Sequence, residues 1–134
     1  ATRSKLVNGF LLAARLPACI PLNEDVVGRF ALDEGAGCNV CAERGPRVMS
    51  FREVEAGQGA FRYRFDFEDG GSHAGAYQFV ATDSSDVSLT LYPDSAGPFY
   101  QDVVGQVILT QYTYRAGVMR EPCGGLFKQC KWKP

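Results

Sequence analysis

Apolar and polar positions alternate through most of the chain, and the clearest run is residues 61–67 (FRYRFDF). A β-strand sends successive side chains to opposite faces, so the four aromatic rings of this run share one face. Arg62, Arg64 and Asp66 then share the other face. The pattern predicts a strand with one buried, aromatic face and one hydrated face.

Five further segments show the same strand-like pattern, and turns rich in Gly, Asp and Ser separate most of them. The expected strands are residues 26–32, 47–54, 60–68, 75–82, 87–91 and 102–115. The connections leave no room for crossover helices, so the strands should be antiparallel. The sequence predicts an all-β, up-and-down meander of six to eight strands. Closing it into a small barrel would remove its exposed edges, and a two-sheet sandwich is the rival architecture.

The two ends are expected to lie outside the regular sheet of a single domain, residues 1–134. Residues 1–22 form an arm or a short helix that either packs on the body or lies on a partner or membrane surface. Residues 116–134 form a C-terminal tail, in which 126–128 could add a short strand. Pro93 to Pro98 reads as a loop. Lys128, Lys131, Trp132 and Lys133 give the tail a basic end that should be solvated.

The alternation fails at Val107, Ile108 and Leu109, which are all apolar. Such a run indicates a strand covered on both faces. The apolar N-terminal arm is one candidate cover and a partner protein is another. The sequence therefore predicts a protein contact through residues 6–16 and 107–109.

Composition and charge argue against several classes of function. The formal net charge is −1 and the isoelectric point is near 5.8, which gives no electrostatic footprint for nucleic acid. Arg15 and two prolines interrupt the longest apolar run, so no transmembrane span is expected. The glycines at 35–37 and 57–59 lack the lysine and the helix of a phosphate loop. No cofactor is expected.

Cysteines are dense for a chain of 134 residues, and their number, five, is odd. They are Cys19, Cys38, Cys41, Cys123 and Cys130. Structural disulfides between tail and loop are the favoured interpretation, with Cys38 and Cys41 as a redox or metal pair the alternatives. The connectivity stays open, and no metal site is predicted. The cysteines and the first residue, Ala1, favour a secreted or organelle-lumen protein that has lost a targeting peptide.

His73, the only histidine, lies in an expected hairpin turn and is predicted to be exposed. The charged residues near that turn are Arg62, Arg64, Asp66, Glu68 and Asp69. They are expected to pair on a solvated face. No nucleophile, base and orienting group come together in the sequence, so an enzyme is not expected.

The sequence resembles the lipocalin, or wider calycin, family. Gly28-Arg29-Phe30 matches the Gly-x-Trp that opens the first strand of that family, with Phe in place of Trp. The resemblance implies that Arg115 packs over this aromatic ring and that Cys123 or Cys130 ties the tail to the barrel. It also implies an internal cavity for an apolar ligand. The inward side chains would be Tyr63, Phe65, Tyr77, Phe79, Leu89, Leu91, Ile108 and Tyr112, which could instead fill a solid core.

The sequence therefore predicts a non-enzymatic binding module that holds a small apolar ligand or a protein partner. The alternative is a small accessory subunit of a larger assembly, such as an organellar membrane complex.

Overall fold

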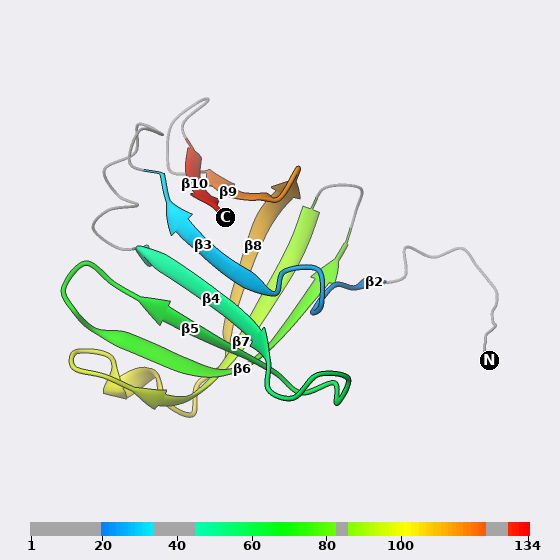
Figure 1. Cartoon of the computed structure of the whole chain (residues 1–134). Coiled ribbons are helices and arrows are strands. Elements are labelled where there is room, and N and C mark those ends of the chain that lie inside the picture. Colours follow the sequence, from blue (N-terminus) through cyan, green and yellow to red (C-terminus); the bar gives the residue numbers. More distant parts are fainter. Residues whose placement is uncertain (1–19, 34–44, 83–85, 123–128) are drawn as a thin grey trace.

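The computed structural model describes residues 20–33, 45–82, 86–122 and 129–134, which contain strands but no α-helix (Figure 1). Eight strands, β3 to β10, follow one another within these ranges, and each pairs antiparallel with the next. β10 also pairs with β3, through Trp132 opposite Leu32 and Lys133 opposite Ala31. The predicted all-β antiparallel meander is therefore confirmed, and it closes into a barrel.

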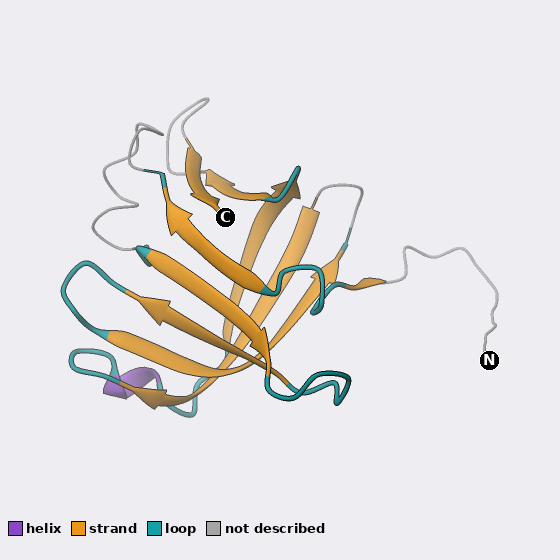
Figure 2. Cartoon of the chain, viewed as in Figure 1, coloured by secondary structure: helices purple, strands orange, loops and turns teal. Residues whose placement is uncertain are grey.

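The eight strands are β3 (Gly28–Leu32), β4 (Val48–Glu53), β5 (Phe61–Asp66), β6 (Ser72–Ala81), β7 (Asp86–Ala96), β8 (Ile108–Arg115), β9 (Val118–Pro122) and β10 (Gln129–Lys133). A short strand, β2 (Ile20–Pro21), pairs with Ala81 and Val80 of β6. A single 3-10 turn, η2 (Gln101–Val103), lies in the connection between β7 and β8 (Figure 2).

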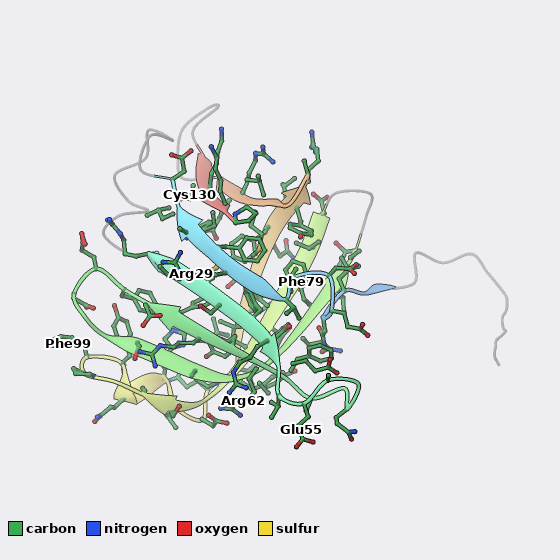
Figure 3. The ribbon with its side chains drawn as sticks, viewed as in Figure 1. Arg29, Glu55, Arg62, Phe79, Phe99 and Cys130 are labelled. Atoms are coloured by element: carbon green, nitrogen blue, oxygen red, sulfur yellow. The ribbon has the colours of Figure 1, made fainter. Side chains whose placement is uncertain are left out.

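Alternate side chains of the strands form one hydrophobic core inside the barrel (Figure 3). The buried apolar residues are Val26, Phe30, Met49, Phe51, Tyr63, Phe65, Tyr77, Phe79, Val87, Leu89, Leu91, Tyr112, Met119, Cys130 and Trp132. Seven of the eight side chains expected to point inward are among them. Ile108 is half-buried and packs against the same core. The inward and outward faces of these strands thus follow the alternation in the sequence.

The expected C-terminal tail is wrong for the described part of residues 116–134. Two barrel strands, β9 and β10, form there, and they close the sheet. Trp132 is 1% exposed, and its indole Nε1–H donates a hydrogen bond of 2.8 Å to the carbonyl oxygen of Pro46. The possible strand at 126–128 lies outside the described residues.

Two other expected boundaries are also wrong. β7 continues through Pro93 to Ala96, where a loop was expected, and β8 begins only at Ile108. A bulge explains the first difference, because Ala74 pairs with Ser95 while Gly75 pairs with Pro93, so that Asp94 is the extra residue. A Cβ on Gly75 would lie 2.0 Å from the carbonyl oxygen of Tyr92. The glycine therefore permits the close approach of β7 at the bulge.

The N-terminal entry to the barrel is held by hydrogen bonds to the free edge of β6. The Asn23 side-chain oxygen accepts from the Phe79 amide at 2.7 Å, and the Tyr77 hydroxyl donates to the Asn23 carbonyl oxygen at 2.8 Å. The Leu22 amide donates to the Phe79 carbonyl oxygen. These bonds satisfy the part of β6 that extends beyond β5. Of the arm or helix expected at residues 1–22, residues 1–19 lie outside the described ranges, and Ile20 to Leu22 are extended and pair with β6.

Candidate functional site

The interior of the barrel is packed with side chains that contact one another. The ring centroids of Phe51 and Tyr77 are 5.0 Å apart, and those of Tyr63 and Phe65 are 5.2 Å apart. Such distances are those of direct edge-to-face contacts in a protein core. The residues predicted to line a ligand cavity thus build a close-packed core in the described structure.

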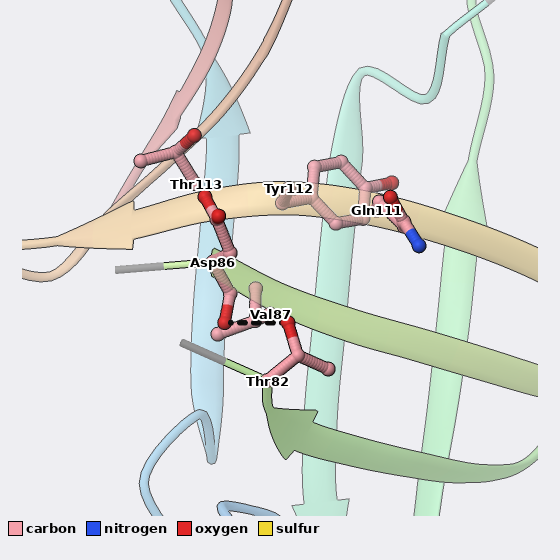
Figure 4. A pocket seen from close by; sticks show the side chains of 6 residues that line it. All are labelled: Thr82, Asp86, Val87, Gln111, Tyr112 and Thr113. Atoms are coloured by element: carbon pink, nitrogen blue, oxygen red, sulfur yellow. Dashed lines mark hydrogen bonds between the residues drawn. The ribbon is translucent and has the colours of Figure 1, made fainter. Parts of the chain in front are cut away.

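A hollow of about 260 Å³ lies where β6, β7 and β8 meet at one end of the barrel (Figure 4). Thr82, Asp86, Val87, Gln111, Tyr112 and Thr113 line it. The Thr82 hydroxyl donates a hydrogen bond of 3.3 Å to the Asp86 carbonyl oxygen at its edge. The hollow is smaller than ordinary ligand pockets of roughly 300–1,000 Å³. Among the described lining residues there is one carboxylate and neither a histidine nor a cysteine, so they offer little for acid-base or nucleophilic chemistry.

Phe30, the residue that the expected lipocalin resemblance sets against the family's tryptophan, is buried. Its ring packs edge-on against Phe51 and Tyr114, with centroids 6.0 and 6.4 Å away. Arg115 is exposed, so the expectation that it covers Phe30 is wrong. Tyr114 takes that place because its side chain points inward from β8, whereas the next residue points outward.

His73 is buried, and the expectation of an exposed turn residue is wrong. β6 begins at Ser72, so His73 already lies on the inward face with Tyr77 and Phe79. Its Nδ1 is 2.8 Å from the Tyr63 hydroxyl. Burial lowers the pKa of His73 and raises that of Tyr63, because both charged forms lose hydration. His73 lies four residues before Tyr77, so the strand alternation places both side chains on the same face, and this was the signal in the sequence for a buried histidine.

The connection between β7 and β8, residues 97–107, packs through Tyr100 on the end of the barrel where His73 lies. The Tyr100 ring stacks on Phe67, with centroids 4.4 Å apart and planes 19° apart. Its hydroxyl donates to Asp69 Oδ2 at 3.1 Å. A Cβ on Gly71 would lie 2.3 Å from the Tyr100 ring, so this turn needs glycine for the contact. The aromatic cluster around His73, which consists of Tyr63, Phe65, Phe67 and Tyr100, thus anchors the 97–107 connection.

The charged residues near that turn are involved in ion pairs or hydrogen bonds, though only one of these ion pairs was expected. Arg64 Nε donates to Asp66 Oδ1 at 3.0 Å, as predicted. Arg62 instead forms a two-point ion pair with the bulge residue Asp94, at 2.7 and 2.9 Å. This bond to Arg62 lowers the pKa of Asp94. The acceptor of Arg47 is Glu68, at 3.2 Å. All these groups reach solvent, which weakens such pairs.

Cys130 is the only cysteine within the described residues. Its side chain is buried and disulfide-bonded, and the partner lies outside the described ranges. The other four cysteines lie outside them too, including the Cys38 and Cys41 pair. The predicted pairing of tail with loop therefore stays a prediction.

The outer surface of β7 and β8 exposes apolar side chains at residues 107–109, and the expected cover by the N-terminal arm or by a partner protein stays a prediction. Val107 is 64% exposed and Leu109 is 66% exposed. Leu109 pairs with Thr90 across the two strands. The Gly105 amide donates to the Pro93 carbonyl oxygen at 3.0 Å, which brings the end of the connection beside β7. We call the exposed residues Tyr92, Val104, Val107 and Leu109 the apolar face.

Comparison with known proteins gives no assignment: no protein-family model, no curated protein and no solved structure matches the chain. The described residues contain no helix with the length and apolarity that crossing a membrane requires. Within the same ranges, no three side chains of His, Cys, Asp or Glu are grouped to hold a metal ion. The barrel, its packed interior and its apolar face are therefore the features that bear on function.

Proposed function

We propose that this protein is a non-enzymatic binding module that docks a partner protein through the apolar face. The observation that carries the proposal is the exposure of Val107 and Leu109, each about two-thirds exposed in a segment whose neighbouring inward residues pack the core. Exposed apolar patches on soluble proteins commonly mark interaction sites. The four side chains that define the apolar face are all uncharged, as is common at the centre of protein interfaces.

A small apolar ligand inside the barrel is the weaker candidate. Phe51, Phe79 and Trp132 are each at most 2% exposed, and they occupy the space that a lipocalin-like ligand would need. A ligand could enter only if such side chains moved, which would sacrifice core packing. The packed interior therefore favours binding on the outside of the barrel.

The size of the apolar face bears on the kind of partner. Large apolar patches on monomers cover roughly 300–600 Å² and are often functional. A stable interface buries roughly 800 Å² on each partner. Four exposed side chains fall short of that area on their own. The proposal therefore includes the apolar residues 6–16, outside the described ranges, as the second part of the contact surface.

The proposal also covers the kinship of the protein and the compartment in which it works. The closed barrel and Gly28-Arg29-Phe30 support kinship with lipocalin-like proteins. The density of cysteines supports an oxidising compartment, either secreted or within an organelle lumen. An accessory subunit of a larger assembly would use the same apolar face, with a partner that covers it permanently.

Site-specific crosslinking tests the proposed contact. A photoreactive residue at Leu109 should crosslink one discrete protein in extracts of the source cells, and the same residue at Val54 should not. Val54 is the matched control because it is 45% exposed but lies in the turn after β4, away from β8. The V107S/L109S variant should then bind the identified partner at least tenfold more weakly. Its stability should change by at most about 0.5 kcal/mol, because both side chains are exposed.

Three outcomes would overturn the proposal. Identical crosslinks from positions 109 and 54 would show that the contact is not specific to the apolar face. A crosslink to a second copy of this chain would replace the partner protein by self-association. A stoichiometric small molecule in native mass spectrometry, retained by V107S/L109S, would restore the ligand inside the barrel as the function.

A further inference from the structure

The connection formed by residues 97–107 links the aromatic residues around His73 to the apolar face. Near its start, Tyr100 stacks on Phe67 and lies beside His73, with ring centroids 4.4 and 5.9 Å away. Near its end, it supplies Val104 and Val107 to the apolar face. A change in the seating of Tyr100 would therefore move residues of the proposed docking surface.

His73 is 5% exposed, and every ring around it is uncharged. β5 contributes Tyr63 and Phe65, the following turn contributes Phe67, and the connection contributes Tyr100. The residue opposite His73 on β7 is Ala96.

Charged groups on these elements do act on the pair of His73 and Tyr63: beyond the effect of burial, Asp94 raises and Arg62 lowers the pKa of Tyr63, and Arg64 lines a hollow together with His73. Asp69 accepts the Tyr100 hydroxyl, and Arg64 and Asp66 bond each other on the outer face. The imidazole therefore has no carboxylate partner among the described residues.

The bond between Tyr63 and His73 depends on the protonation of the imidazole. A tyrosine hydroxyl that donates to Nδ1 requires a neutral ring with its proton on Nε2. A second proton makes Nδ1 a donor that points at the same hydroxyl. The Tyr63 hydrogen would then have to turn away toward a different acceptor. Protonation would thus reverse the direction of the bond and place a charge without a carboxylate partner within the aromatic cluster.

We propose that His73 and Tyr63 form a pH-sensitive latch, which seats the 97–107 connection while His73 is neutral and releases it when His73 is protonated. The latch regulates the apolar face, so its biological role rests on the docking function proposed above. Burial of the imidazole, which lowers the pKa of His73, supports the same direction. The neutral, seated form is complete above the ordinary histidine pKa near 6.5 and weakens as the pH falls below it.

The latch can be tested on the full chain without any partner. NMR would follow the protonation of the His73 imidazole and the amide hydrogen exchange of residues 97–107 between pH 7.5 and pH 5, corrected for intrinsic exchange. Opening of the connection should increase by about tenfold for each pH unit below 6.5, until His73 itself titrates. The turn at residues 55–59 has no contact with the cluster, and it should show no such slope.

Variants separate the latch from general acid sensitivity. In His73→Phe the opening of the connection should lose its pH dependence. In Tyr63→Phe the titration midpoint of His73 and the opening of the connection should shift together to higher pH. Asp69→Asn should loosen Tyr100 at every pH but keep the slope. Glu121, whose pKa burial also raises, lies on β9, and Glu121→Gln should leave the slope unchanged.

An opening that stays constant while His73 titrates would overturn the latch, as would an unchanged slope in His73→Phe. If His73→Phe does not fold, independent shifts of the two midpoints in Tyr63→Phe would overturn it equally. These readouts involve no partner, so they can fail while the docking function holds. Conversely, a working latch with no crosslink at position 109 would overturn the docking proposal and leave the latch intact.

Discussion

Trp132 joins the last strand of the barrel to the connection that precedes β4. Its Nε1–H donates to the buried carbonyl oxygen of Pro46 at 2.8 Å, and its ring packs edge-on against Tyr112. Trp132→Phe would remove the donor and leave both a small void and an unsatisfied carbonyl. We expect the free energy of unfolding to fall by about 2–4 kcal/mol, measured by urea denaturation followed by circular dichroism. Tyr92→Phe, at an exposed ring, is the control and should change little.

An unchanged denaturation midpoint in Trp132→Phe would contradict the role given to this indole. The residue also shows why the burial of this strand is difficult to predict from the sequence. Cys130 and Trp132 alternate with Gln129, Lys131 and Lys133 in a strand pattern, but the lysines suggested a solvated end. His73 was misplaced similarly, because the turn signal at Gly71 outweighed its parity with Tyr77. In both cases composition obscured a two-residue period that was present.

The pairing of β6 with β7 depends on a glycine at the bulge. A Cβ on Gly75 would lie 2.0 Å from the Tyr92 carbonyl oxygen and 2.8 Å from Pro93 Cα, both of them backbone atoms. Gly75→Ala should therefore push the strands apart and cost about 1–3 kcal/mol of stability. Thermal unfolding would measure the loss. Ala76→Ser, at the next and exposed position, should leave the melting temperature within a degree or two of the parent's.

Equal melting temperatures for Gly75→Ala and the parent would mean that the bulge does not require this close approach. The bulge also explains why the element boundaries near β7 were difficult to predict. Pro93 suggested a loop, but a bulge tolerates proline within a strand. The apolar run at 107–109 raised a different difficulty. A sequence shows that such a strand needs cover on both faces, but it does not show whether that cover comes from the same chain.

At the scale of the whole molecule, the alternation predicted the meander and its inward residues, but it did not decide between barrel and sandwich. The decision depends on β10, which pairs with β3 through Trp132 and Lys133. That contact joins residues a hundred positions apart, and no local period encodes it. The candidate docking site was predictable in part, at Val107 and Leu109. Tyr92 and Val104 join it only through the folding of the connection.

The buried tyrosines give the whole barrel a defined response to alkali. Burial raises the pKa of Tyr63, Tyr77 and Tyr112, because the phenolate would lose its hydration inside the core. A group with a raised folded pKa contributes stability that is complete below its ordinary pKa, near 10 for tyrosine, and is lost as the pH rises toward the folded value. We expect ionisation of these three to coincide with cooperative unfolding.

Ultraviolet difference spectra recorded with circular dichroism along one alkaline titration would check this, since phenolate absorbance and strand signal should change together. Tyr77→Phe tests a single site, because its hydroxyl donates only to the Asn23 carbonyl oxygen. It should remove one late-ionising group and leave the other two coupled to unfolding. If all tyrosines ionised before any loss of strand signal, the interior would be open to hydroxide and water. The argument against a ligand cavity would then lose its physical basis, because a close-packed core excludes both.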